Sequence, residues 1–297
     1  MMNNNKLKGI SLVAFGAISY GMLATFVKLA YKEGYTTAEV TTAQFVYGII
    51  GLLLLQLFFK RNSRKETAKP SKKNITQLII AGSSIGFTSV FYYLCVKYIN
   101  VSIAIVLLMQ TVWMGVFLEW ILEKKKPSAQ KISAVIIVII GTLLATNLLN
   151  NKVEIDWKGL TFGLLAAASF TTTMFTANRI ALGVSTTNRS LYMLLGGAII
   201  VGVFALLSQN TPFNLHIFEK WGIVLALFGT IIPPLLMNAG FPITGLGLGS
   251  IISALELPVS VIMAFSILNE SVIFSQWVGI TLIIAAIALL NVKINKK

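Results

Sequence analysis

Long apolar segments recur along the whole 297-residue chain and are separated by short polar or charged segments. A helix that crosses the apolar core of a bilayer needs roughly 20 apolar residues. Windows of that kind fall at 9–30, 38–59, 75–96, 101–122, 129–148, 158–181, 188–208, 218–242, 247–268 and 272–292. The pattern predicts an all-α integral membrane protein with ten transmembrane helices and leaves no room for a soluble domain.

The composition agrees with a chain that faces lipid. Apolar residues make up 56% of the sequence and charged residues 11%, whereas a soluble domain usually carries about 25% charged residues. The net charge of +14 would suggest nucleic acid in a soluble protein. Here the basic residues lie in short runs between apolar spans, so we expect the lipid bilayer as the partner and no nucleic acid.

The basic runs also predict the orientation. Eighteen of the 24 lysines and arginines fall in the N-terminal segment, the connections after the second, fourth and sixth spans, and the C-terminal segment; six fall on the other side. Basic residues are retained on the cytoplasmic side. We therefore expect both termini and the charged linker 60–74 in the cytoplasm.

Few residues are available for catalysis or metal binding. Cys95 and His216 are the only cysteine and histidine, and Asp156 is the only aspartate. An enzyme needs nucleophiles, acids or metal ligands that converge on one point. We expect neither an enzyme nor a metal site, and no cofactor.

Two stretches of the chain repeat. Residues 8–29 align without a gap on 158–179, with Gly9 on Gly159 and Tyr20 on Phe170, and a later match sets Gln110 on Glu256. Residues 1–150 and 151–297 then each hold five spans, an odd number, so the second repeat crosses the membrane upside down. Inverted repeats of this kind are typical of transporters that expose a central site alternately to each side.

The chain resembles the drug/metabolite transporter superfamily, in its EamA-like family. The most specific similarity is LELPVSVIMAFSILNESVIFSQWVGITLIIAAIALL, with a Leu-Glu-x-Pro-Val core, Glu270 and Gly279. The first-repeat counterpart MQTVWMGVFLEW departs, since it has neither the Glu nor the Pro. The resemblance implies a transporter of small organic solutes in the bacterial inner membrane, with a cavity lined by the first, third, fourth, sixth, eighth and ninth spans.

Glu256 lies in the middle of the ninth span, IISALELPVSVIM. An intramembrane carboxylate is costly and is therefore a functional group by default. Gly249, Ser253, Glu256 and Ser260 share one helix face. Pro258 has no N–H, so we expect it to bend the helix and free the Ala254 carbonyl. Because desolvation disfavours the ionised form, we hypothesise that Glu256 exchanges a proton during transport.

Other spans carry polar groups that could line the same site. The eighth has Pro233 and Pro234, expected to free the carbonyls of Gly229 and Thr230. The candidate substrate-binding or coupling residues are Glu256, Gln110, Trp113, Tyr92, Asn238, Thr172, Ser253 and Lys28. For a single hydroxyl, helix packing is the more common role, and Lys28 can instead extend to the interface. Residues 245–250, GLGLGS, are interpreted as a flexible turn.

Three functions compete. The first is secondary transport of amino acids or related metabolites, with export expected and proton coupling as a hypothesis. The second is transport of an organic cation, held near Glu256 by Phe87, Tyr92, Tyr93 and Trp113 through cation–π attraction. The third is a membrane assembly subunit that transports nothing, which would not need a polar, proline-broken centre. A homodimer is compatible with each of them.

Overall fold

The computed structural model describes residues 4–62, 70–99, 101–124, 126–146 and 156–290, and in these residues all regular secondary structure is helical. The first repeat contains α1 (Asn4–Lys32), α2 (Thr37–Asn62), α3 (Lys72–Tyr98), α4 (Val101–Leu108), α5 (Thr111–Glu123) and α6 (Ala129–Ala145). The second contains α7 (Trp157–Arg179), α8 (Thr186–Ser208), α9 (Ile223–Ala226), α10 (Ile232–Thr244), α11 (Leu246–Ser253), α12 (Glu256–Leu268) and α13 (Phe274–Leu289). Two π-helical segments, η2 (Phe218–Gly222) and η3 (Leu227–Ile231), flank α9.

Eight helical segments are long and apolar enough to cross a membrane, and two shorter apolar helices, α6 and α13, accompany them. The chain is therefore an integral membrane protein. Each predicted window coincides, to within about five residues at its ends, with one helix or with a series of consecutive helical segments. The linker predicted at 60–74 lies partly, and the C-terminal residues 291–297 wholly, outside the described residues.

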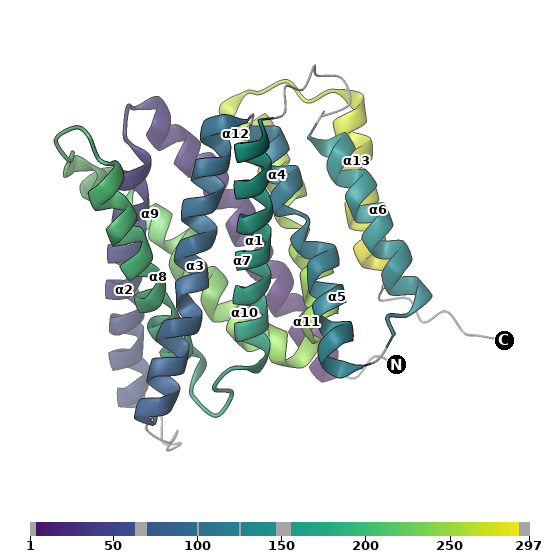
Figure 1. The fold of residues 1–297 in the computed structure, drawn as a ribbon, viewed down its shortest axis with the longest axis horizontal. Coiled ribbons are helices and arrows are strands. Elements are labelled where there is room, and N and C mark those ends of the chain that lie inside the picture. Colours follow the sequence, from purple (N-terminus) through teal and green to yellow (C-terminus); the bar gives the residue numbers. More distant parts are fainter. Residues whose placement is uncertain (1–3, 63–69, 100, 125, 147–155, 291–297) are drawn as a thin grey trace.

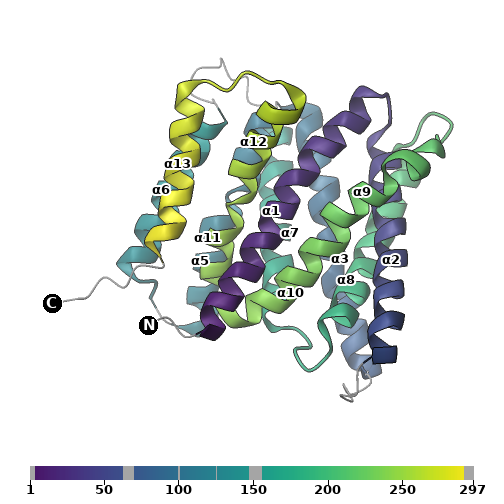
Figure 2. The same ribbon diagram turned by 180° about the vertical axis from the view of Figure 1, so that it is seen from behind.

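The helices form one bundle in which α6 and α13 pack together at one edge, while α2 and α8 lie at the opposite edge (Figures 1 and 2). In the centre, α1 packs on α10 and α12, and α3 packs on α7 and α8. The first turn of α1 and the last turn of α13 lie at the same end of the bundle. We call this the terminal end, and the end that carries Lys28 the Lys28 end.

Contacts made by aligned residues correspond between the two repeats. A Cβ on Gly9 would meet Ile243 at the end of α10, and a Cβ on Gly159 would meet Ile99 just after α3. At the edge pair, Gln130 donates from the start of α6 to the Leu289 carbonyl, and Gln276 donates from the start of α13 to the Ala145 carbonyl. Aligned residues therefore make matching contacts in the two halves of the chain.

The ninth span is interrupted at Ala254 and Leu255, between α11 and α12. The expectation of a free Ala254 carbonyl is wrong, because this carbonyl accepts the Leu257 N–H at 3.2 Å. The interpretation of residues 245–250 as a flexible turn is also wrong: helix α11 begins at Leu246 and all of its residues are buried. Only Gly245, with φ of 81°, has the left-handed backbone that suits a glycine between two helices.

The fourth span is interrupted one residue later in the alignment, at Met109 and Gln110, although it contains no proline. In the eighth span the Ile232 N–H bonds to Leu227, five residues back, and Pro233 has no N–H to give. The carbonyl of Phe228 is thereby left to accept the Ser19 hydroxyl from α1 at 3.2 Å. The prolines thus create an acceptor for a neighbouring helix one residue before the carbonyls that were predicted.

Candidate functional site

A large cavity of about 560 Å³ runs from the middle of the bundle toward the Lys28 end. All six spans expected to line it do so, and the second, fifth and tenth spans add residues near the Lys28 end. Its inner part holds Glu256, Ser260, Thr88 and Thr173, and its mouth holds Lys28 and Glu270. Its volume is that of a pocket for a small organic molecule.

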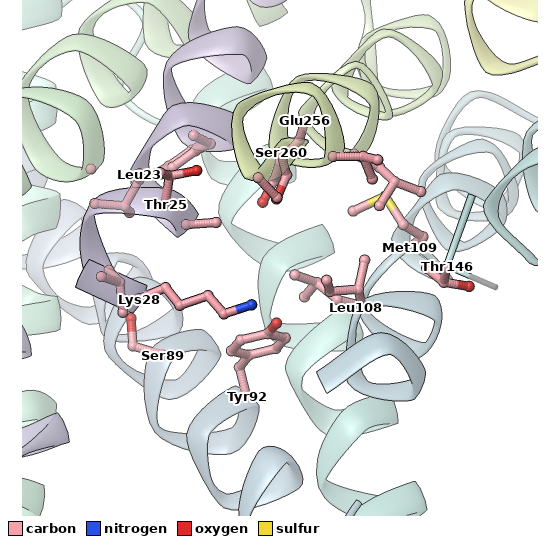
Figure 3. Close-up of a pocket in the computed structure, with 18 of the residues that line it drawn as sticks. Leu23, Thr25, Lys28, Ser89, Tyr92, Leu108, Met109, Thr146, Glu256 and Ser260 are labelled. Carbon is pink, nitrogen blue, oxygen red and sulfur yellow. The ribbon is translucent and has the colours of Figure 1, made fainter. Parts of the chain in front are cut away.

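Glu256 is the first residue of α12, directly after the interruption of the ninth span. The interruption turns its side chain into the cavity, on the same side as Ser260 (Figure 3). Gly21 of α1 allows this position, since a Cβ there would come within 2.5 Å of the Glu256 carbonyl oxygen. The carboxylate therefore faces the cavity at a point where two helices are in close contact.

Lys28 and Glu270 form an ion pair at the cavity mouth. Their side chains are 51% and 40% exposed, so the pair is open to solvent, and exposed pairs of this kind contribute little to stability. The Lys28 ammonium points into the cavity toward the Tyr92 hydroxyl, across from Glu256 (Figure 3). A solute in the cavity could therefore meet a cation and a carboxylate at separate positions.

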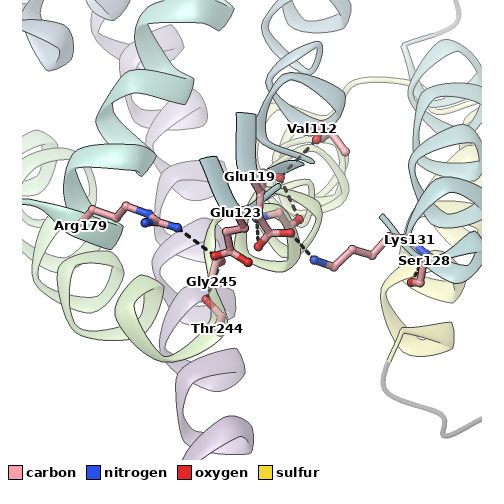
Figure 4. Close-up of polar contacts among 10 residues, drawn as sticks. Val112, Glu119, Glu123, Ser128, Lys131, Arg179, Thr244 and Gly245 are labelled. Atoms are coloured by element: carbon pink, nitrogen blue, oxygen red, sulfur yellow. Dashed lines mark hydrogen bonds and ion pairs between the residues drawn. The ribbon is translucent and has the colours of Figure 1, made fainter. Parts of the chain in front are cut away.

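The terminal end of the bundle is closed by ion pairs (Figure 4). Glu119 pairs with Lys131 and also accepts the Gly247 N–H at 3.0 Å, at the start of α11. Glu123 pairs with Arg179 of α7 at 2.9 Å. These partners lie on other helices, so the contacts of Glu119 and Glu123 connect α5 with α6, α7 and α11.

Arg189, near the start of α8, is another basic group at this end, and it is only 2% exposed. Its guanidinium donates to the carbonyls of Thr176, Ala177, Ile180 and Asn238. Three of these belong to the last turn of α7 or follow it, where a helix has unpaired carbonyls and partial negative charge. Arg189 therefore joins α8, α7 and α10 below the cavity.

The structure brings three predicted residues, Glu256, Tyr92 and Lys28, together around the cavity. Gln110 and Trp113 are not among the lining residues; the Trp113 indole donates to the Gln110 side chain at 2.8 Å. Ser253 is buried and donates to the Gly249 carbonyl. Thr172 is exposed on the outside of the bundle, one residue before Thr173, which does line the cavity. Of the proposed aromatic cage, Phe87 and Trp113 are also exposed outside the cavity, at 38% each.

Asn238 lines a second, much smaller void of about 20 Å³. Its amide nitrogen donates to Ser190 at 2.9 Å, and its backbone carbonyl accepts from Arg189. Sequence reasoning also missed cavity residues, among them Tyr20, Tyr31 and Gln44. The sequence did contain a signal for Tyr20, because this residue aligns with the aromatic Phe170 in the repeat.

In the part of the chain that the structure describes, no cluster of three or more His, Cys, Asp or Glu side chains is arranged to hold a metal ion. The polar groups of the cavity are therefore the Glu256 carboxylate in its inner part, the Lys28–Glu270 ion pair at its mouth, and several hydroxyls, and aromatic rings line it as well.

Comparison with known proteins places this arrangement in a family. No curated protein matches the chain. One solved structure, described only as the crystal structure of a protein, has a TM-score of 0.75 and 14% sequence identity, covering 94% of this chain and 96% of that one; at this identity it is evidence of a shared fold alone. The sequence model of the EamA-like transporter family matches residues 7–147 and again residues 157–292. The chain therefore belongs to the EamA-like transporter family, as its sequence motifs predicted.

Proposed function

We propose that the protein is a secondary transporter that exports amino acids or related metabolites by alternating access. The observation that carries the proposal is the one-ended cavity: it reaches Glu256 from the Lys28 end, while ion pairs close the terminal end. With the termini in the bacterial cytoplasm, this is the outward-facing state. Loss of the pairs at the terminal end would give access from the other side.

The internal repeat supports the alternation. We propose ten spans in two inverted repeats, residues 1–150 and 151–297, because the family model matches twice and the reciprocal glutamine contacts join α6 and α13. In a transporter of inverted repeats, the two halves exchange conformations to move the opening from one face to the other.

The charges of the cavity support a dipolar solute. Lys28 suits a carboxylate, and Glu256 suits an ammonium group, so an amino acid would place its two ends at these two side chains. A cavity of about 560 Å³ accommodates such a molecule with a medium-sized side chain. The organic-cation alternative is less well supported, because Phe87 and Trp113 lie outside the cavity and Lys28 would repel a cation.

Purified protein in proteoliposomes tests the proposal. A thermal-shift screen with amino acids, amines, sugars and nucleosides identifies the solute, since a ligand of the folded state raises the melting temperature. Transport of the best ligand is then compared between wild type, Lys28→Gln and Lys32→Gln. Lys32 is on the same helix and is exposed, so it is the matched control.

We expect transport by the Lys28→Gln protein to fall about tenfold, the effect of losing one charged contact of about 1.5 kcal/mol, and Lys32→Gln to behave as wild type. Equal transport by the two variants would show that Lys28 is not part of the solute-binding site. A protein that binds solutes but moves none would favour the assembly-subunit alternative, and a preference for quaternary amines would favour the cation.

A further inference from the structure

The main cavity ends in the middle of the bundle on four side chains. Tyr20, Ile85, Phe170 and Thr173 line the main cavity, and the same four also line the small void of about 20 Å³ beside Asn238. They therefore form a septum between the two spaces. The void also touches Ala177, in the last turn of α7 next to Arg179, so it lies between the septum and the closed terminal end.

The two aromatic members of the septum make one contact. The rings of Tyr20 and Phe170 meet edge to face, with centroids 6.1 Å apart and an interplanar angle of 84°. A single aromatic contact of this kind is weak enough for a conformational change to separate the two rings. The two residues align with each other in the internal repeat, so one ring comes from the equivalent position of each half.

Asn238 also has an equivalent in the first repeat. Tyr92 precedes Ile99, the C-cap residue that follows α3, by seven positions, and Asn238 precedes Gly245, the C-cap residue that follows α10, by seven positions. Tyr92 lines the present cavity. If the repeats exchange conformations, Asn238 takes the corresponding place in a cavity that opens at the terminal end.

The side chain of Asn238 has an unused acceptor. Its exposure is 2%, its nitrogen donates to Ser190, and its Oδ1 atom is buried without a hydrogen-bond partner. A buried unpaired oxygen costs free energy, which a ligand that donates a hydrogen bond would recover.

We propose that the solute path continues through the Tyr20–Phe170 septum to Asn238, whose side-chain oxygen receives a hydrogen-bond donor of the solute, such as an ammonium or amide group. The proposal rests on the transport function proposed above. The septum is then the barrier between the two openings, and Asn238 is the polar contact on the terminal side of it.

Cysteine accessibility tests the septum without any solute. In a Cys95→Ala background, single cysteines are placed at Ser260, in the main cavity, and at Met237, in the small void. A membrane-impermeant thiol reagent is applied to the membrane face that carries Lys28. We expect rapid labelling at position 260 and protection at position 237.

Removing both rings, as Tyr20→Ala with Phe170→Ala, is expected to speed labelling at position 237 at least tenfold, while Tyr20→Phe keeps it protected. The matched control is Phe26→Ala with Phe228→Ala, which removes a stacked pair with centroids 5.2 Å apart outside the cavity lining. This control should leave position 237 protected. Labelling of position 237 in the parent protein, or protection after both septum rings are removed, would overturn the septum.

Transport measurements test Asn238. Asn238→Leu keeps the size and removes the acceptor, so transport should fall about tenfold, while binding from the Lys28 side stays within twofold of wild type. Ser190→Ala removes only the partner of the amide nitrogen and should leave transport within twofold. Equal losses of transport in Asn238→Leu and Ser190→Ala would show that Asn238 has only a structural role. If the wild type moves no solute, the transport function itself fails, whereas the labelling result still decides the septum.

Discussion

The fourth and ninth spans are both interrupted, at positions that lie one residue apart in the alignment, but they use the interruption differently. In the ninth span, Glu256 follows the break and faces the cavity, and Pro258 follows two residues later. In the fourth span, Gln110 stands at the break and turns back on its own helix: its amide nitrogen donates to the Val106 carbonyl at 3.0 Å.

The hydrogen bonds explain the role of Gln110. The Gln110 N–H bonds to Leu107, three residues back, in place of Val106, four residues back. The Val106 carbonyl would then lack its helical partner, and the side chain of Gln110 supplies one. An apolar environment makes an unpaired carbonyl costly, so the amide stabilises the break.

The comparison shows that the break belongs to the repeat, whereas the carboxylate belongs to one copy. Both copies have a short helix that ends in the middle of the bundle, but only the second presents an ionisable group there. The second interruption therefore carries a carboxylate that faces the cavity, and the first carries an amide that satisfies the backbone. Substitutions at the two positions should have effects of different kinds.

The largest effect is expected from Glu256→Gln. The amide keeps the shape of the side chain but cannot exchange a proton or attract an ammonium group. Loss of a charged contact of about 1.5–3 kcal/mol should lower transport by about tenfold or more, and the pH dependence of transport should disappear. Uptake into proteoliposomes over a pH series measures both.

Glu270→Gln, at the exposed mouth, is the control for a charge elsewhere in the cavity; it should retain the pH dependence. An unchanged pH profile in the Glu256→Gln protein would end the proton-exchange hypothesis and leave Glu256 as a solute-binding or structural group.

The second effect is a loss of stability in Gln110→Leu. Removing the amide leaves the Val106 carbonyl unpaired, which should lower the free energy of unfolding by about 1 kcal/mol. Transport per folded molecule should stay close to wild type, because Gln110 is not among the cavity-lining residues. Thermal melts in detergent and transport assays separate the two quantities.

Trp113→Phe is the matched variant, since it removes the indole donor to Gln110 and leaves the bond from Gln110 to Val106 in place. Its melting temperature should fall less than that of Gln110→Leu. A transport defect in Gln110→Leu that exceeds its loss of folded protein would contradict the purely structural role.

Glu256 and Gln110 also show what could be predicted from the sequence. The positions of the helices follow from hydropathy, because each span must hide its backbone from lipid. The charge of Glu256 in an apolar span predicted a polar group inside the bundle, and Glu256 lines the cavity. The direction of Gln110 depends on one backbone hydrogen bond, which no residue pattern encodes. The fourth span contains no proline, so its sequence does not indicate the break.

Thr172 shows a further limit of prediction from the sequence. A stripe of hydroxyls on the sixth span identifies a polar face but not how the helix is rotated against its neighbours. Successive residues of a helix point about 100° apart, so Thr173 lines the cavity and hydrogen bonds with Ser84, while Thr172 is exposed and donates to its own helix at Ala168. Rotation depends on packing between helices that are distant in sequence.

A smaller effect is expected from Pro258→Ala. Proline in a helix interior costs about 3 kcal/mol when it breaks a helix that would otherwise be continuous. The fourth span is interrupted without a proline, so the break should persist in the ninth span when Pro258 is replaced. We expect the free energy of unfolding to change by less than about 1 kcal/mol and transport to stay within about threefold. Stabilisation near the full proline cost would mean that Pro258 alone interrupts the ninth span.

The smallest change in transport is expected between Glu256→Gln and the double variant Gln110→Glu with Glu256→Gln, which exchanges the two side chains. The total number of carboxylates is then that of the wild type, but the carboxylate at position 110 lies outside the cavity lining. Transport per folded molecule and its pH profile should therefore equal those of Glu256→Gln alone. Ionised glutamate cannot donate to the Val106 carbonyl, so the double variant should also melt lower than the single one. Recovery of pH-dependent transport in the double variant would show that the two breaks present their side chains to the same cavity, and that the difference between the repeats is one of residue type and not of position.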